Sequence, residues 1–75
     1  MIGKRVCIDL SQDEAVVLHD WLFRFNKSKD HILEDQAEQR ELWDIEAVLE
    51  SKVDILFDPQ YGELLKIARS KVRDA

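Results

Sequence analysis

The sequence contains only one cysteine, two glycines and one proline in 75 residues. An intrachain disulfide needs two cysteines, so Cys7 excludes one, whereas small secreted domains usually depend on several. Gly3 and Gly62 lie too far apart to form the glycine-rich loop that cradles nucleotide phosphates. These absences indicate short connections between elements and a reducing compartment, for which we expect the cytoplasm.

Long apolar runs and an excess of positive charge are also missing. No stretch approaches the roughly 18 consecutive apolar residues of a membrane-spanning helix, and the N-terminal MIGKRVCIDL lacks the apolar run of a signal peptide. The formal net charge is −5. Phosphate contacts need clustered lysine and arginine, so this charge argues against nucleic acid or anionic lipid and favours a basic macromolecule as partner.

The negative charge is concentrated between Glu34 and Glu50, where seven carboxylates stand against one arginine. At about 100° per residue, the second half of this predicted helix gathers apolar side chains on one face: Leu42, Ile45, Val48, Leu49 and Val53. Towards the helix start the same face becomes acidic, with Glu34, Asp35, Glu38 and Glu41. Two interpretations remain open, because these carboxylates suit both the positive end of the helix dipole and a docking surface for a basic partner.

Residues 4–10 alternate between apolar and polar side chains. Three apolar residues share one face of an extended chain and three polar ones share the other: Val6, Ile8 and Leu10 against Arg5, Cys7 and Asp9. This period of two predicts a half-buried β-strand. A lone strand leaves its backbone donors and acceptors unpaired. The pattern therefore requires a partner strand, either residues 53–57 or the same strand of a second copy.

The first helix is predicted to begin near Gln12. Ser11 and Glu14 have the spacing of a capping box, in which each side chain bonds the backbone N–H of the other residue. The main apolar arc has the spacing of a core helix and contains Ala15, Val17, Leu18, Trp21, Leu22 and Phe25. A second apolar strip lies away from this arc and comprises Val16, His19 and Phe23. This strip either receives the N-terminal strand or forms an exposed docking patch.

Two further helices are predicted. Ser28 or Asp30 would cap the second one, which runs to about Lys52 and places Trp43 at the edge of the core. Asp58 and Pro59 would start the third helix with a capping carboxylate and a proline at its first position. The apolar residues of the third helix have the clearest amphipathic spacing in the chain: Tyr61, Leu64, Leu65, Ala68 and Val72. Its polar side offers an internal counterpart to the acidic segment, formed by Lys66, Arg69 and Arg73.

Together these patterns predict a single domain over residues 1–75, of mainly α class, with an N-terminal β-strand followed by a three-helix bundle. A chain of this size buries only about 60 to 65 % of its unfolded surface, so we expect one modest core. Its central side chains would be Leu22, Leu42, Leu49, Leu64 and Leu65.

No group of residues has the spacing of a usual catalytic or metal site. Metal or acid–base chemistry would use two histidines and nearby carboxylates: His19, Asp20, His31, Glu34 and Asp35. The histidines lie on different elements, and no His-x-x-x-His spacing occurs. Cys7 lies within the predicted strand, without the basic or helix-start environment that activates a thiol. We therefore expect no enzyme activity, no cofactor and no metal.

Nearly the whole chain takes part in one further pattern, in which the alternating N-terminal segment is followed by SQDEAVVLHDWLFRFN, EDQAEQRELWDIEAVLE and a Tyr-x-x-Leu-Leu helix ending in ARSKVRD. In this combination the chain resembles a group of short uncharacterised bacterial proteins with an acidic helix of the EDQAEQRxLW type. The resemblance implies a bacterial, cytosolic, freestanding domain. It assigns no function and no site residue.

The sequence favours a non-enzymatic, acidic, cytosolic protein that binds another macromolecule, with a basic protein as the expected partner. An immunity- or antitoxin-like neutraliser of a basic toxin or nuclease would have this size and charge. The candidate protein-binding residues lie on the acidic helix and on the second strip of the first helix: Glu34, Glu38, Glu41, Val16, His19 and Phe23.

Three other possibilities remain open. The order strand, helix, helix matches ribbon-helix-helix regulators, dimers whose paired strands read DNA, although Asp9 and the acidic second helix oppose phosphate contact. A small metal-dependent enzyme would need His19, His31 and nearby carboxylates to converge in one pocket. The unpaired strand and the second apolar strip also predict self-association as a symmetric homodimer.

Overall fold

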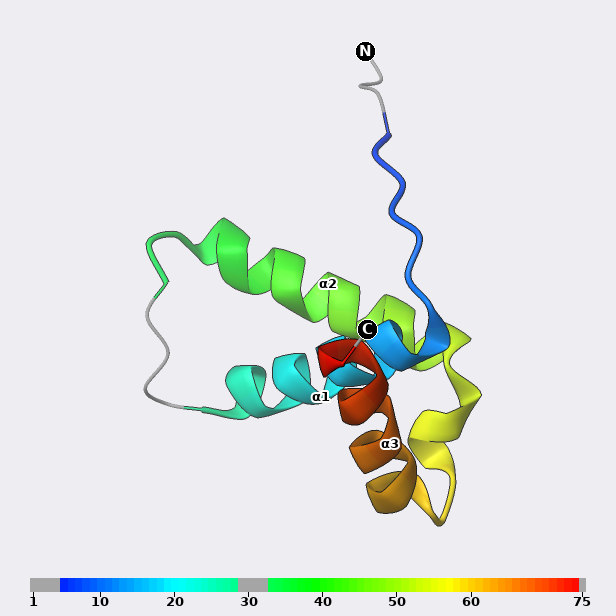
Figure 1. Cartoon of the computed structure of the whole chain (residues 1–75). Helices are drawn as coiled ribbons and strands as arrows, with labels where there is room; N and C mark the ends of the chain where they lie inside the picture. Colours follow the sequence, from blue (N-terminus) through cyan, green and yellow to red (C-terminus); the bar gives the residue numbers. More distant parts are fainter. Residues whose placement is uncertain (1–4, 29–32, 75) are drawn as a thin grey trace.

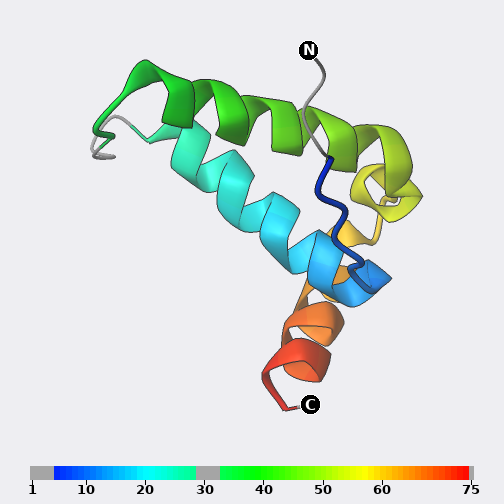
Figure 2. The ribbon, with the colours of Figure 1, turned by 90° about the horizontal axis from the view of Figure 1, so that it is seen from above.

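The computed structural model describes residues 5–28 and 33–74. Three α-helices and one short 3-10 helix follow in order: α1 (Gln12–Lys27), α2 (Gln36–Lys52), η1 (Asp54–Phe57) and α3 (Tyr61–Arg73). Helices α1 and α2 run side by side in opposite directions, and α3 packs across α1 (Figures 1 and 2). The predicted bundle of three helices is confirmed. None of the helices in the described ranges has the length and apolarity needed to cross a bilayer.

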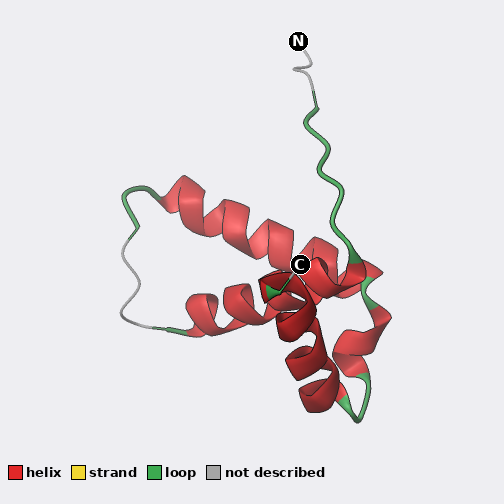
Figure 3. Ribbon diagram, in the orientation of Figure 1, coloured by secondary structure: helices red, strands yellow, loops and turns green. Residues whose placement is uncertain are grey.

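The predicted N-terminal β-strand is wrong for the single chain. Residues 5–10 form an extended arm, and no strand occurs in the described part of the chain (Figure 3). Lys4, its predicted first residue, lies outside that part. The proposed internal partner, residues 53–57, contains the C-cap of α2 and η1 instead of a strand. The arm therefore keeps the alternation of a strand without a neighbouring backbone that could pair with it.

The start of α1 follows its sequence closely. The Ser11 hydroxyl accepts the backbone N–H of Glu14 at 3.1 Å, and the Glu14 carboxylate accepts the N–H of Ser11 at 2.8 Å. The predicted capping box is therefore confirmed. Arg24 and Lys27 occupy the last turn, where positive charge suits the negative end of the helix dipole.

Helix α2 begins later than predicted. Its N-cap is Asp35, whose carboxylate accepts the N–H of Ala37 at 2.7 Å. Ser28 is the C-cap of α1, and Asp30 lies outside the described residues. Serine and aspartate are both favoured at a helix start, so the composition of this connection could not identify which of them caps α2.

Helix α3, like α2, begins later than predicted, because Pro59 and Gln60 form a non-helical turn before it. The Asp58 carboxylate accepts the N–H of Gln60 at 2.7 Å, and Gln60 occupies the N-cap position of the helix without a capping hydrogen bond from its side chain. Pro59 consequently lies in the turn before α3 and not at its first helical position. The predicted inner face is confirmed at its centre, where Leu65 and Ala68 are buried.

The core lies where the first three turns of α1 meet the end of α2 and the middle of α3. Its buried apolar residues are Ala15, Val16, Leu22, Leu49, Val53, Leu65 and Ala68. Leu42 and Leu64, which were predicted to be central, are only half-buried. The last turn of α1 and the first three turns of α2 contribute no buried residue. Apolar burial is therefore concentrated at one end of the α1–α2 pair.

Helix α1 is the central helix, which explains its two apolar strips. Both α2 and α3 pack against it, so two of its faces must be apolar. Val16 is 0 % exposed and His19 is 8 % exposed. The predicted alternatives for this strip, a cover from the N-terminal strand or an exposed patch, are therefore wrong for these two residues. Trp21, assigned to the main arc, is 44 % exposed and stacks on Phe25.

Candidate protein-binding surface

The first turns of α2 contain carboxylates with a structural role and carboxylates without one. Asp35 caps the helix, and the Glu38 carboxylate accepts the backbone N–H of Glu34 at 2.9 Å. Both contacts satisfy backbone donors at a helix start. The carboxylates of Glu34 and Glu41 have no polar partner among the described residues, so capping explains Asp35 and Glu38 but not the other two.

A shallow apolar hollow lies beside these carboxylates. It has a volume of about 390 Å³ and is lined by Leu33, Ala37, Glu38, Glu41 and Leu42. The side chains of Glu34, Glu38 and Glu41 are all exposed. We call this surface the acidic patch. Its floor is Leu33, Ala37 and Leu42, and Glu38 and Glu41 line its rim. We include Glu34 in the rim because its backbone N–H contacts the Glu38 carboxylate.

The cations of α3 do not neutralise the acidic patch, so the predicted internal counterpart is wrong. Arg69 pairs with Asp20 of α1 at 2.7 Å. Lys66 and Arg73 pair locally, with Glu63 at 3.7 Å and Asp74 at 3.4 Å. The physical reason is that α3 packs across α1, where Asp20 lies, and not along the first half of α2. Among the described residues, no cation of α3 is therefore paired with the rim.

Trp43 adjoins the acidic patch, and the prediction of its burial is wrong. It was predicted at the edge of the core but is 55 % exposed. It lines a second hollow with Gln36, Ala37, Gln39 and Arg40, and Ala37 borders both hollows. A signal was present in the sequence, because the residues three and seven positions before Trp43 on the helix surface are the polar Arg40 and Gln36.

The predicted binding residues of α1 do not form a surface together. Phe23 is 40 % exposed, with the Lys27 ammonium 4.1 Å from its ring centroid. Its ring also stacks on His19, with 6.2 Å between centroids. Since Val16 and His19 are buried, Phe23 alone could meet a partner.

A cavity of about 230 Å³ lies between α1, the end of α2, η1 and the start of α3. It is lined by His19, Asp20, Phe23, Glu50, Leu56, Phe57 and Tyr61. Asp20 is held there by two guanidinium groups, those of Arg24 at 2.9 Å and Arg69 at 2.7 Å. Burial, and after it the negative charge of Asp20, raise the pKa of Tyr61. This cavity is therefore a junction of four elements.

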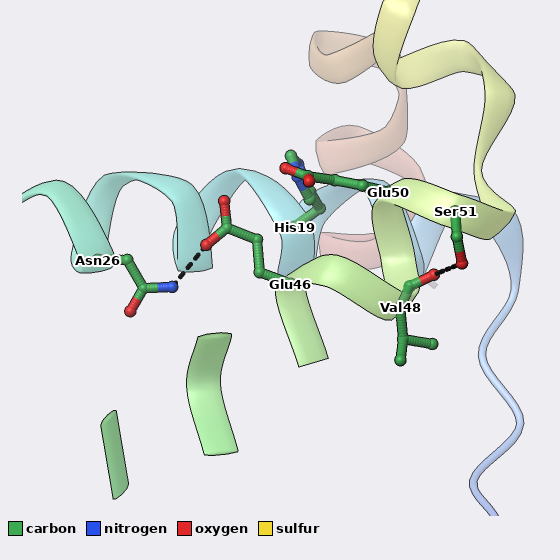
Figure 4. A network of polar contacts seen from close by, with 6 residues as sticks. All are labelled: His19, Asn26, Glu46, Val48, Glu50 and Ser51. Carbon is green, nitrogen blue, oxygen red and sulfur yellow. Dashed lines mark hydrogen bonds and ion pairs between the residues drawn. The ribbon is translucent and has the colours of Figure 1, made fainter. Parts of the chain in front are cut away.

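His19 belongs to a possible cation-binding cluster at the edge of this cavity. Nitrogen and carboxylate atoms of His19, Glu46 and Glu50 all lie within 4.8 Å of one another. The Nε2 atom of His19 lies 3.0 Å from the Glu50 carboxylate, and Glu46 accepts the Asn26 amide at 2.6 Å (Figure 4). One imidazole and two carboxylates are a donor set that zinc or iron can use.

The surroundings of the His19 ring argue against a metal as the purpose of this cluster. The Nδ1 atom of His19 is buried and has no hydrogen-bond partner in the described ranges, 5–28 and 33–74. When Nε2–H donates to Glu50, Nδ1 is an unprotonated acceptor. A metal bound to Nε2 would require the proton to be on Nδ1. In metal-binding histidines that N–H normally donates to an acceptor, and His19 has no such acceptor among the described residues. The cluster is better explained as a polar contact that holds α2 on α1.

The other candidates for chemistry are not brought together. Cys7 is exposed in the arm, and His31 lies outside the described residues. Of the residues singled out for metal or acid–base chemistry, His19 and Asp20 line the same cavity. Asp20 is occupied there by two arginines.

Compared with protein-family models, with curated proteins and with solved structures, the chain has no significant match in any of the three. None of these comparisons bears on the resemblance to short bacterial proteins. The acidic patch is therefore interpreted from its own geometry and charge.

Proposed function

We propose that this chain is a non-catalytic protein-binding module that docks a basic partner on the acidic patch. The observation that supports the proposal is an apolar hollow lined by Glu41, whose exposed carboxylate has no partner among the described residues. The exposed carboxylate of Glu34, next to the lining residue Leu33 in the chain, has none either. A lysine or arginine of the partner would pair with the rim. An apolar side chain of the partner would fill the hollow.

Charge and burial would have separate roles at this surface. Complementary charge speeds association and rejects partners of the same sign, whereas solvated rim pairs add little affinity. The apolar floor and the exposed indole of Trp43 beside it would supply the buried area. The partner class that we propose is a small basic protein, such as a toxin or nuclease, neutralised in the bacterial cytoplasm.

DNA binding has less support. Arg5 is the only cation among the outward residues of the arm, and Asp9 on the same face would repel a phosphate. The cation of α3 that lies nearest to α1, Arg69, is paired with Asp20. A duplex approaching α2 would meet the acidic patch.

Site-specific photo-crosslinking in cells that naturally express the chain tests the proposal. A photoreactive amino acid at Ala37, on the floor of the patch, should form an adduct with a basic protein. The same group at Ile67, which is exposed on α3, should not. Glu41→Lys should remove most of the Ala37 adduct, and adding Glu34→Lys should remove the rest. Both substitutions leave the Glu38 capping contact in place.

Asp54→Lys is the matched control, because it makes the same charge change at an exposed residue of η1. It should leave the adduct unchanged. With the partner purified, affinity should fall steeply with salt, since the Debye length shortens from about 10 Å at 0.1 M to about 3 Å at 1 M. Circular dichroism must show that each variant keeps its helix content. The proposal is wrong if folded Glu41→Lys keeps the adduct, or if Ala37 and Ile67 capture the same proteins.

A further inference from the structure

The N-terminal arm is extended, apolar on one face and unpaired. Val6 is 87 % exposed and Ile8 is 78 % exposed. No backbone group of residues 5–10 forms a hydrogen bond with another described residue, and the arm leaves the start of α1 and extends past α2 (Figure 1). A segment with this alternation usually buries one face and pairs its backbone. Neither condition is met within one chain.

We propose that two copies of the chain pair their arms as an antiparallel two-stranded ribbon, with the two-fold axis at Cys7. In this register, residues whose numbers sum to fourteen lie opposite each other. Val6 then faces the partner's Ile8, and Arg5 faces the partner's Asp9. Because the arrangement is symmetric, each of these pairs forms twice.

The charges and the alternation of the arm favour this register over shifted antiparallel registers and over parallel pairing. Opposed residues of an antiparallel pair lie on the same face, so a shift of one residue would place apolar side chains against polar ones. A shift of the axis to Val6 or Ile8 keeps the faces but separates Arg5 from Asp9. Parallel pairing in register would oppose Arg5 to the partner's Arg5. Only the axis at Cys7 gives apolar pairs and opposite charges together.

Helix α2 offers a cover for the apolar face of such a ribbon. A hollow of about 510 Å³ lies between the arm and α2. Glu41 and Asp44 line part of it, and its apolar lining is Val6, Ile8, Leu10, Leu18, Ile45, Val48 and Leu49. Val48 is 51 % exposed in the single chain. A second arm beside the first would double the apolar surface that faces this hollow. Backbone pairing and apolar burial would therefore be satisfied in one step.

Charge exchange between the two copies tests the register. Arg5→Asp leaves two aspartates opposite each other at both pairs, and Asp9→Arg leaves two arginines. Each substitution alone should weaken self-association by at least about tenfold. An equimolar mixture of the two variants should restore it, because the mixed dimer again opposes aspartate to arginine at both pairs. The double variant Arg5→Asp/Asp9→Arg should also associate like the parent chain.

Sedimentation equilibrium from micromolar to submillimolar concentration measures these constants, and circular dichroism confirms that the helices are intact. A second reading is oxidation with copper phenanthroline, which should link Cys7 to the partner's Cys7 in the parent chain and much less in each single variant. The inference is overturned if the parent chain is monomeric throughout, if the single variants associate normally, or if the mixture fails to recover.

The failure of this inference can be told apart from failure of the acidic patch. The Arg5→Asp variant is a folded monomer if the ribbon is real, and it keeps Glu34 and Glu41. Its crosslink from Ala37 to the basic protein should therefore persist. Loss of that crosslink in a folded monomer would mean that partner binding depends on the dimer.

Discussion

Asp20 connects two helices, because its carboxylate accepts hydrogen bonds from one arginine on α1 and one on α3. Arg24 lies one turn along α1 and Arg69 comes from α3, while the Asp20 side chain is only 15 % exposed. Charge-assisted hydrogen bonds at a largely buried carboxylate are stronger than those at the surface. Asp20 thus adds a polar contact to the apolar packing of α3 on α1 and places negative charge beside Tyr61.

Asp20→Asn should lower the free energy of unfolding by about 1 to 3 kcal/mol, because it weakens two charge-assisted bonds. Asp44→Asn is the control. Asp44 lies 3.8 Å from Arg40 with both side chains more than half exposed, so it should cost less than about 1 kcal/mol. Urea denaturation of the two variants measures both values, and equal losses would contradict the role assigned to Asp20.

Tyr61 should make stability fall in alkaline solution. Its pKa is raised in the folded chain by burial and by Asp20, so the unfolded chain loses the proton first, at its usual pKa of about 10. The contribution of this shift is fully present below that pH and is lost as the pH rises through the folded pKa. Tyr61 is the only tyrosine in the sequence. Tyrosinate absorbance therefore reports its pKa directly, and Tyr61→Phe should remove this part of the pH dependence.

At the scale of the elements, the inner face of α3 gives a direct stability test. Leu65 is 8 % exposed and belongs to the core, whereas Leu64 is half-buried. Leu65→Ala should cost about 2 to 5 kcal/mol, and Leu64→Ala should cost less because fewer contacts are lost. Denaturant midpoints measure both losses. A larger loss for Leu64→Ala than for Leu65→Ala would contradict the face of α3 that packs against α1 in this structure.

Local signals in the sequence were enough to predict the elements they act on. The Ser11–Glu14 capping box and the spacing of α3 were read correctly because both depend on residues within one or two turns. The N-terminal strand was not predicted correctly. Alternating residues form a strand only when another backbone pairs with them, and no described segment pairs with residues 5–10. The pairing of Arg69 with Asp20 spans 49 positions in the sequence. Its existence depends on how α3 crosses α1.

The candidate site was predictable to a similar degree. The carboxylates of Glu34, Glu38 and Glu41 are exposed as expected, because charged side chains rarely enter a core unpaired. Val16 and His19 were assigned to a possible docking patch. Their spacing shows that one face of the helix is apolar, but it does not show that a second helix covers that face.

At the scale of the whole molecule, the two ends of the α1–α2 pair are held by different forces. Buried apolar residues join α1 to the last turns of α2 and to α3. Towards the other end the apolar contacts of α2 come only from half-buried side chains such as Leu42. Polar contacts are added there, with the Asn26 amide donating to Glu46 at 2.6 Å and accepting from Gln39 at 2.9 Å. Apolar burial supplies most folding free energy, so the polar end should open more easily.

Hydrogen exchange should reveal this difference within one helix. Backbone amides near Gln39 and Arg40 should exchange faster than those near Leu49, because local opening there exposes no buried apolar residue. Asn26→Ala should widen the difference, since it removes both polar contacts without touching the core. Uniform protection along α2, measured by NMR, would contradict this description.

The two hydrogen bonds of Asn26, to Glu46 and Gln39, have a consequence for recognition. They help to hold the half of α2 on which the acidic patch lies. A partner that binds the ordered form must offset the conformational entropy of ordering that half. Substitutions that stiffen the first turns of α2 would then raise affinity without adding a single contact to the interface. Affinity would be adjustable from residues that the partner never touches.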